Sequence, residues 1–185
     1  MTERRDEDSL WKAAREGDAG AFGDLISALH PAIFRTVLGM FGDYQEAEDV
    51  TQEVFLRVWT ALPKLKPDTK MSAWIRRVAI NASIDHLRRR RRRRWWPWGS
   101  MPMNENVAQE RISTGEGQTE VAEHVYSALK KLPEHYRATA VLREIDGLSY
   151  EEIADVLECS VGTVRSRLSR ARAQMKENLK PYIKG

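Results

Sequence analysis

Apolar residues recur at every third or fourth position through most of this chain, and strict apolar–polar alternation is absent. A period near 3.6 residues is typical of amphipathic helices. Proline lacks a backbone N–H, so Pro31 is expected to follow the end of one helix and open the next. The pattern predicts an all-α fold with helices over about 8–16, 18–29, 31–41, 43–62, 72–88, 119–131, 133–146, 149–158 and 160–179.

The longest interruption of the helical pattern is over residues 95–118, which are rich in Pro, Gly, Asn and Ser. Such a composition predicts a flexible linker. The chain is therefore expected to form two small helical domains, one of four to five helices over residues 1–94 and one of four helices over residues 119–185. Trp95, Trp96 and Trp98 are large apolar groups for a linker, and they are expected to lie against the first domain or a partner.

Positive charge is concentrated in two blocks, although the formal net charge is only +3. Residues 71–94 contain nine arginines and one acid, and seven of these arginines form the run Arg88–Arg94. Residues 160–180 contain six Lys or Arg and one acid, so the remainder of the chain is acidic. This segregation predicts local, salt-dependent binding to a polyanion.

The helix expected over residues 72–88 has a narrow polar stripe between two apolar arcs. At about 100° per residue, the stripe contains Trp74, Arg77, Asn81, Asp85 and Arg88. These side chains can stack on bases and hydrogen-bond to base edges and phosphates. A buried helix with solvated edges is the alternative, and the adjacent arginine run favours a nucleic-acid partner.

Two helices joined by a short turn at residues 158–160 have helix-turn-helix form. Ser160 is a good N-cap for the second helix, in which Val164 and Leu168 belong to the apolar face. Small and basic residues occupy the opposite face and its flanks: Gly162, Thr163, Arg165, Ser166, Arg167, Ser169, Arg170 and Arg172. This composition suits entry into a DNA major groove. A basic helix within a bundle is the alternative.

The helix over residues 43–62 carries an outward patch of Asp49, Gln52, Glu53 and Leu56. An exposed leucine among acids is typical of a protein contact surface, and the acids are unsuited to DNA. A basic protein partner is expected. A solvated acidic face with one exposed leucine is an equally good interpretation of this helix.

Other features exclude several classes of site. Cys159 is the only cysteine, and the four histidines have no metal-binding spacing, so we expect no disulfide, metal or cofactor. No signal peptide or apolar segment of spanning length is visible, which predicts a soluble cytoplasmic protein without membrane insertion. No catalytic residues are expected.

Three segments together resemble the extracytoplasmic-function (group four) sigma factors of the sigma-70 family. They are EAEDVTQEVFLRVW (46–59), AWIRRVAINASIDHLRRR (73–90) and LPEHYRATAVLREIDGLSYEEIADVLECSVGTVRSRLSRARAQM (132–175). The resemblance implies an alternative sigma factor that binds core RNA polymerase, recognises the minus-thirty-five and minus-ten promoter elements and promotes melting. Domain two would span 1–94 and domain four 119–185. The run Arg88–Arg94 is longer than the family pattern needs.

The resemblance also implies residue roles and partners. The clamp coiled coil of the polymerase β′ subunit would bind Asp49, Gln52, Glu53 and Leu56. The minus-ten element would contact Lys66, Asp68, Lys70, Ser72, Trp74, Arg77, Asn81, Asp85 and Arg88, with the loop over 66–72 and Asn81 holding flipped bases. The minus-thirty-five element would contact Ser160, Gly162, Thr163, Arg165, Ser166, Arg167 and Arg170. Domain four would also bind the β flap, and an anti-sigma factor is expected.

Two other functions fit parts of the sequence. A one-component helix-turn-helix regulator would require a ligand pocket within residues 1–94, and it would leave the acidic patch and the polar stripe unexplained. A nuclease could use Glu46, Asp49 and Glu53 as metal ligands, but no histidine or acid on a second helix joins them recognisably.

Overall fold

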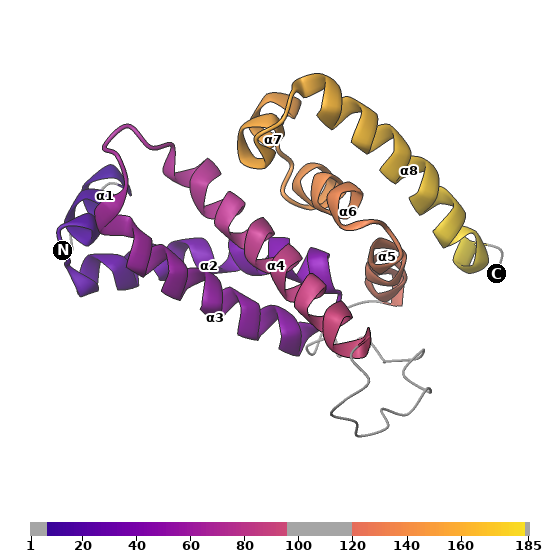
Figure 1. Cartoon of the computed structure of the whole chain (residues 1–185), viewed down its shortest axis with the longest axis horizontal. Coiled ribbons are helices and arrows are strands. Elements are labelled where there is room, and N and C mark those ends of the chain that lie inside the picture. The colour runs from indigo at the N-terminus through magenta and orange to yellow at the C-terminus, as the bar shows by residue number, and fades with distance from the viewer. Residues whose placement is uncertain (1–6, 96–119, 184–185) are drawn as a thin grey trace.

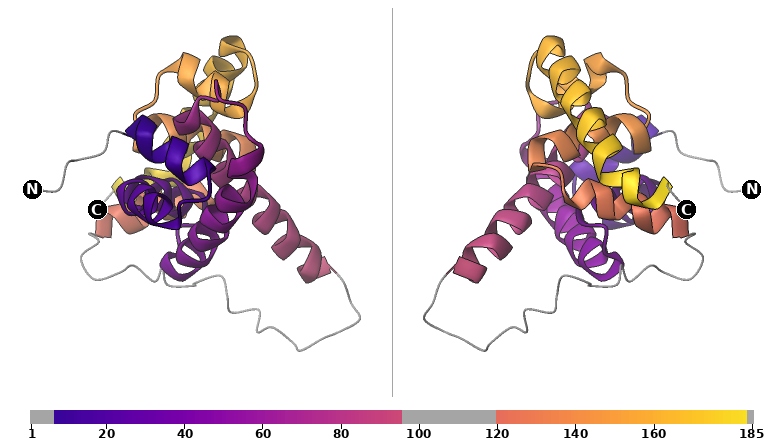
Figure 2. Two further views of the ribbon diagram at one scale, coloured as in Figure 1. Left: turned by 90° about the vertical axis from the view of Figure 1, so that its left-hand side faces the viewer. Right: turned by 90° about the vertical axis from the view of Figure 1, so that its right-hand side faces the viewer.

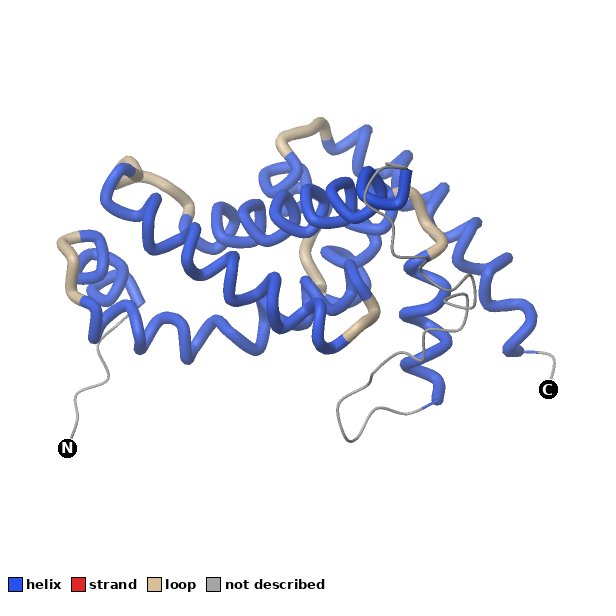
Figure 3. The backbone as a smooth tube through the Cα atoms, turned by 60° about the horizontal axis from the view of Figure 1, so that its bottom comes forward, coloured by secondary structure: helices blue, strands red, loops and turns tan. Residues whose placement is uncertain are grey.

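The computed structural model describes residues 7–95 and 120–183, and within these ranges the chain forms helices and turns without a strand (Figure 3). The all-α prediction is confirmed. Trp95 ends a helix, and the rest of the expected linker, including Trp96 and Trp98, lies outside the described residues. No described helix is both long and apolar enough to cross a bilayer.

The first half contains four α-helices, in which α2, α3 and α4 lie alongside one another and α1 covers one end (Figure 1). Their bounds are α1 Glu7–Arg15, α2 Ala19–Phe41, α3 Tyr44–Ala61 and α4 Met71–Trp95, with a 3-10 turn, η1, at Leu62–Lys64. Leu25, Val37, Val54, Val58 and Ile75 are among the buried residues that form its core. This core fixes the faces that α3 and α4 present to solvent.

Capping side chains set several helix starts. Asp18 Oδ1 accepts hydrogen bonds from the backbone N–H groups of Gly20 and Ala21 at the start of α2. Asp43 caps α3 by accepting from the Glu46 N–H at 2.8 Å. These bonds satisfy backbone donors that have no partner within the helix.

The expected break at Pro31 is wrong, because α2 continues through it from Ala19 to Phe41. Pro31 lies on the exposed side of the helix, where water can reach the carbonyl left without its N–H partner. Leu25 on one side of the proline and Ile33 on the other are each 1% exposed. Burial of one continuous apolar face therefore outweighs the local cost of the proline.

The helix predicted over residues 72–88 is also longer than expected, since α4 extends to Trp95. Arginine is a good helix former, and acids on α3 compensate part of the charge. Arg90 bonds to Glu46, and Arg89 Nη2 lies 3.6 Å from Glu53 Oε2. The arginine run therefore continues the helix.

The second half consists of α5 Glu120–Lys130, α6 Glu134–Ala140, α7 Tyr150–Leu157 and α8 Val161–Ile183. A π-helical turn, η3, at Val141–Ile145 continues α6 and completes the predicted helix over 133–146. Ser149 and Glu152 form the reciprocal hydrogen bonds of a capping box at the start of α7. Ser160 Oγ accepts from the Thr163 N–H at 3.1 Å, as predicted for the start of the last helix.

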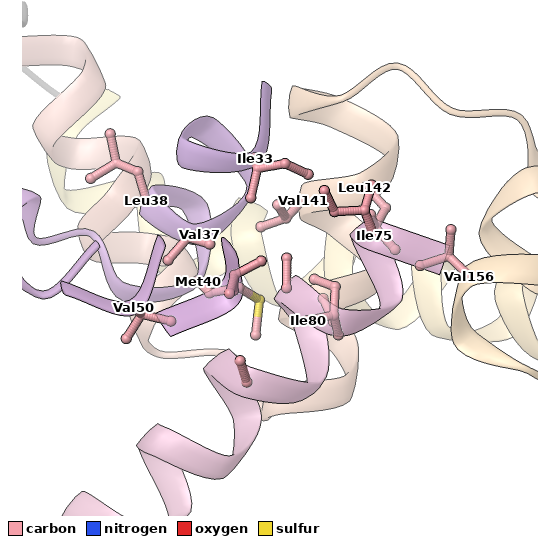
Figure 4. Close-up of a cluster of buried hydrophobic side chains, with 14 of the residues drawn as sticks. Ile33, Val37, Leu38, Met40, Val50, Ile75, Ile80, Val141, Leu142 and Val156 are labelled. Carbon is pink, nitrogen blue, oxygen red and sulfur yellow. The ribbon is translucent and has the colours of Figure 1, made fainter. Parts of the chain in front are cut away.

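The two halves lie against each other, with α6 and α7 facing α2 and α4 (Figures 1 and 2). Figure 4 shows side chains from both halves in one buried cluster, including Ile33, Val37 and Ile75 with Val141 and Val156. Asp146 of the second half also bonds to Thr36 of α2 across this boundary.

Candidate functional site

The predicted contact patch on α3 is exposed. Asp49 and Gln52 face solvent, and Leu56 is 68% exposed. An apolar depression of about 490 Å³ adjoins the leucine between α2 and α3. Its lining comprises Ala19, Phe22, Ile26, His30, Gln52, Phe55, Leu56 and Trp59. Exposed apolar area beside polar side chains has the character of a protein-binding surface.

Glu53 differs from its neighbours in the patch because arginines already surround it. Its Oε1 accepts from Arg57 Nη2 at 2.6 Å, and Arg89 lies on its other oxygen. Burial by itself would raise the pKa of Glu53, but the hydrogen bonds and charges of Arg57 and Arg89 outweigh burial and lower it. The sequence did not predict that the arginine run reaches this patch.

Along the polar stripe of α4, some side chains contact the second half of the chain and others face solvent. Trp74 is half-buried and Asn81 is exposed. Asp85 Oδ2 lies 3.8 Å from Arg57 Nη1. Arg77 and Arg88 instead bond to residues of the second half. The exposed amide of Asn81 leaves an acceptor and a donor available to a base edge.

The loop before α4 has Lys66, Asp68 and Ser72 exposed. A cavity of about 620 Å³ opens beside it, and helix α1 supplies part of the wall. The lining consists of Glu7, Asp8, Trp11, Pro67, Asp68, Thr69, Lys70, Met71 and Ser72. The contribution of α1 was missed, because nothing in the sequence pattern brings residues 7–11 next to residues 67–72.

Helix α8 presents its predicted outer face to solvent. Gly162, Arg165, Ser166 and Arg170 are exposed, while Thr163 and Arg167 are half-buried. The predicted inner face is confirmed, since Val164, Leu168 and Ala171 are fully buried.

Bonds to neighbouring groups orient three arginines of this helix, and Arg172 Nη2 donates to Glu144 Oε1 at 2.8 Å. Arg170 Nη1 donates to the Tyr136 hydroxyl at 3.0 Å, and this bond raises the pKa of Arg170. Arg167 Nη1 lies 4.0 Å from Cys159 Sγ. The small exposed residues of this face allow the helix to approach the base edges in a DNA major groove closely, and the arginines beside them are oriented by their bonds.

The arrangement does not suit metal chemistry at the residues considered for a nuclease. Glu46 is bound by Arg90, and Glu53 by Arg57 and Arg89. Across residues 7–95 and 120–183, no group of three or more His, Cys, Asp or Glu side chains is placed to hold a metal.

Comparison with known families covers both halves of the chain. Sigma-70 region 2 matches residues 25–93, and Sigma-70, region 4 matches residues 122–175. The RNA polymerase sigma-H factor of Pseudomonas aeruginosa is 33% identical, with all of this chain and 98% of that protein aligned. The ECF RNA polymerase sigma-E factor of Escherichia coli K12 is 31% identical over the full length of both. This chain belongs to the extracytoplasmic-function sigma factors of the sigma-70 family.

Solved structures agree with this assignment. CnrH in complex with the cytosolic domain of CnrY superposes on this sigma factor with a TM-score of 0.68 at 29% identity, covering 94% of this chain and 97% of CnrH. The sigma factor RpoE of Bartonella quintana, solved with the anti-sigma factor NepR, gives 0.69 at 26% identity, covering 86% and 96%. The full-length matches are to sigma factors, so the one-component regulator is not favoured.

Proposed function

We propose that this sigma factor binds core RNA polymerase through the patch formed by Asp49, Gln52, Glu53 and Leu56 on α3. The β′ clamp coiled coil is the expected partner, with basic groups for the acids and apolar side chains for the depression beside Leu56. The single observation that carries this proposal is the 68% exposure of Leu56 next to that depression. Leucine in such a position gains free energy when a partner covers it.

The minus-ten element is assigned to α4 and the loop before it. The cavity beside the loop offers carboxylates, a lysine and a hydroxyl to the edge of an unpaired base. Asn81 lies exposed on the same helix. The residues assigned to this element are Lys66, Asp68, Lys70, Ser72, Trp74, Arg77, Asn81, Asp85 and Arg88. Holding unstacked bases stabilises the open duplex, which is how the protein promotes melting.

The minus-thirty-five element is assigned to the N-terminal half of α8. Its exposed serine and glycine allow close approach, and its arginines can donate to guanine edges or phosphates. The residues assigned to this element are Ser160, Gly162, Thr163, Arg165, Ser166, Arg167 and Arg170. The second half is also assigned to the polymerase β flap.

The remaining assignments follow from the same role. The protein needs no catalytic residue or cofactor, because the polymerase performs the chemistry, and it acts in the cytoplasm, where polymerase and promoter DNA are found. We assign residues 1–94 to domain two, 95–118 to the linker and 119–185 to domain four. An anti-sigma factor is expected as a further partner, since CnrH and RpoE were each solved with another protein, which for RpoE is named an anti-sigma factor.

Run-off transcription tests the proposed function. Core RNA polymerase is incubated with promoter-containing genomic fragments, with and without the protein, and the 5′ ends of the transcripts are mapped. New start sites that share two upstream sequence elements are expected only when the protein is present. An unchanged transcript pattern would overturn the proposal.

A further inference from the structure

Arg77 of α4, which the proposed function assigns to promoter DNA, is occupied by the other half of the chain. Its Nη2 donates to the Asp155 carbonyl at 2.5 Å, its Nε to the Val156 carbonyl at 3.2 Å, and its Nη1 to Glu158 Oε1 at 2.6 Å. The last carbonyls of a helix have no partner within it and carry its negative dipole end. Arg77 therefore caps the C-terminal end of α7.

Two further cations assigned to DNA have the same kind of partner. Lys70 Nζ lies 2.8 Å from Asp155 Oδ2, and Arg88 Nε lies 3.2 Å from Glu134 Oε2. All three interactions place oxygen atoms of the second half on cations of the first. Carboxylate and phosphate oxygens accept from guanidinium and ammonium groups in similar geometry, so both cannot occupy these cations together.

An apolar seam behind these contacts brings the two halves close together. A Cβ built on Gly39 of α2 would lie 2.8 Å from side-chain atoms of both Val141 and Ile145. The glycine therefore permits α2 to approach η3 more closely than any other residue would. Arg137 of α6 donates to the Met40 carbonyl at 2.6 Å beside this seam.

The contact covers one DNA-binding face and leaves the other open. Arg165, Ser166 and Arg170 on α8 remain exposed while α7 lies on Arg77. In the closed arrangement, in which the two halves lie against each other, α8 can therefore bind a duplex while the minus-ten face of α4 is still covered.

We propose that helix α7, together with Glu134 of α6, is a built-in competitor of single-stranded DNA for the face that Lys70, Arg77 and Arg88 form on α4 and the loop before it. This inference rests on the proposed function, because the competition requires that α4 binds unpaired promoter DNA. Binding of a single strand to α4 then requires the two halves to separate. Because only open molecules bind the strand, the apparent affinity is the affinity of the open form multiplied by the fraction of molecules that are open.

The first test neutralises the acids of the competitor without altering any residue assigned to DNA. The probe is a fluorescently labelled oligothymidine, and its anisotropy is measured with the full chain. Asp155→Asn combined with Glu158→Gln removes the charge from two exposed ion pairs and is expected to tighten binding about fivefold. The control, Glu120→Gln combined with Glu177→Gln, makes the same change in net charge on α5 and α8. Equal gains in both double variants would overturn the competition.

The second test opens the seam sterically. Gly39→Ala places a methyl group against Val141 and Ile145, whereas the control Gly23→Ala, in the same helix, meets nothing within 4 Å. Alanine favours the helix at both positions, so circular dichroism should show α2 intact. Gly39→Ala is expected to raise the radius of gyration in small-angle X-ray scattering and to tighten oligothymidine binding about tenfold. Adding Arg77→Ala should abolish the tighter binding, because Arg77 is one of the residues assigned to the strand.

The two measurements test the closed arrangement and the competition with DNA separately. An unchanged radius of gyration in Gly39→Ala and in the double acid variant would overturn the closed arrangement. A larger radius without tighter strand binding would overturn the competition. Neither result affects the proposed function, which run-off transcription by the same variants measures independently.

Discussion

Replacing Leu56 by alanine tests the polymerase-binding patch with a magnitude that follows from the structure. The side chain is 68% exposed, and burying a leucine completely is worth about 1.5–3 kcal/mol. Covering the exposed part in a complex therefore contributes about 1–2 kcal/mol, and its loss should weaken binding about fivefold to thirtyfold. Because the residue is mostly exposed, the free energy of unfolding should change by no more than about 0.5 kcal/mol.

The assay is isothermal titration of the protein with a purified fragment of the β′ clamp coiled coil, accompanied by urea unfolding. Val121→Ala is the matched control, because it shortens an equally exposed apolar side chain, 69% exposed, on α5. Unaltered affinity in Leu56→Ala, or equal weakening in both variants, would refute the assignment of the patch.

Three further predictions concern stability and specificity. Arg137→Ala should lower the free energy of unfolding by about 3 kcal/mol in urea titrations, because the buried carbonyls of Met40 and Leu132, to which this 7% exposed arginine donates, lose their partner. Burial raises the pKa of Asp146 in the folded protein, so protonated Asp146 stabilises the fold at acid pH. This contribution to the free energy of unfolding is lost as pH rises through the raised pKa. Asp146→Asn should make the free energy of unfolding depend less on pH over that range. Ser166→Ala should alter preference within the minus-thirty-five element, whereas Arg92→Ala should weaken DNA binding across sequences and reduce its salt dependence in filter-binding assays. A change of preference in the arginine variant with an unaltered salt slope would contradict the last assignment.

Groups around Asp146 oppose the effect of burial on its pKa. The Thr36 hydroxyl lies 3.1 Å from the Ala32 carbonyl and 2.7 Å from Asp146 Oδ2. Thr36 donates its hydroxyl proton to the Asp146 carboxylate, and this bond favours the ionised form and lowers the pKa of Asp146. The charges of Arg76 and Arg35 also lower this pKa, and burial outweighs all three groups.

Much of the fold could be predicted because the local signals agree with the tertiary structure. Asp43 and Ser149 cap the helices that they were expected to start, and the apolar face of α8 is buried as its period indicated. Pro31 failed as a boundary because tertiary burial of Leu25 and Ile33 overrode a local preference.

The sequence predicted which residues of the candidate site are exposed, but not which distant residues contact them. Periodicity placed Asn81 and Leu56 on exposed faces, and both are exposed. It could not show that Arg77 would cap α7 or that Glu7 would line a cavity with the loop before α4, because those contacts join residues far apart in the chain. Local patterns determine which face a residue occupies, whereas tertiary contacts determine what covers it.

The central claim, that α4 holds unpaired promoter bases, is tested most directly by permanganate footprinting of thymines in complexes with core polymerase. The protein should make thymines of the minus-ten region reactive on a duplex promoter. Asn81→Ala should reduce that reactivity on the duplex much more than it reduces binding to a template with a pre-melted bubble. Full reactivity in the variant, or equal losses on both templates, would contradict a melting role for this helix.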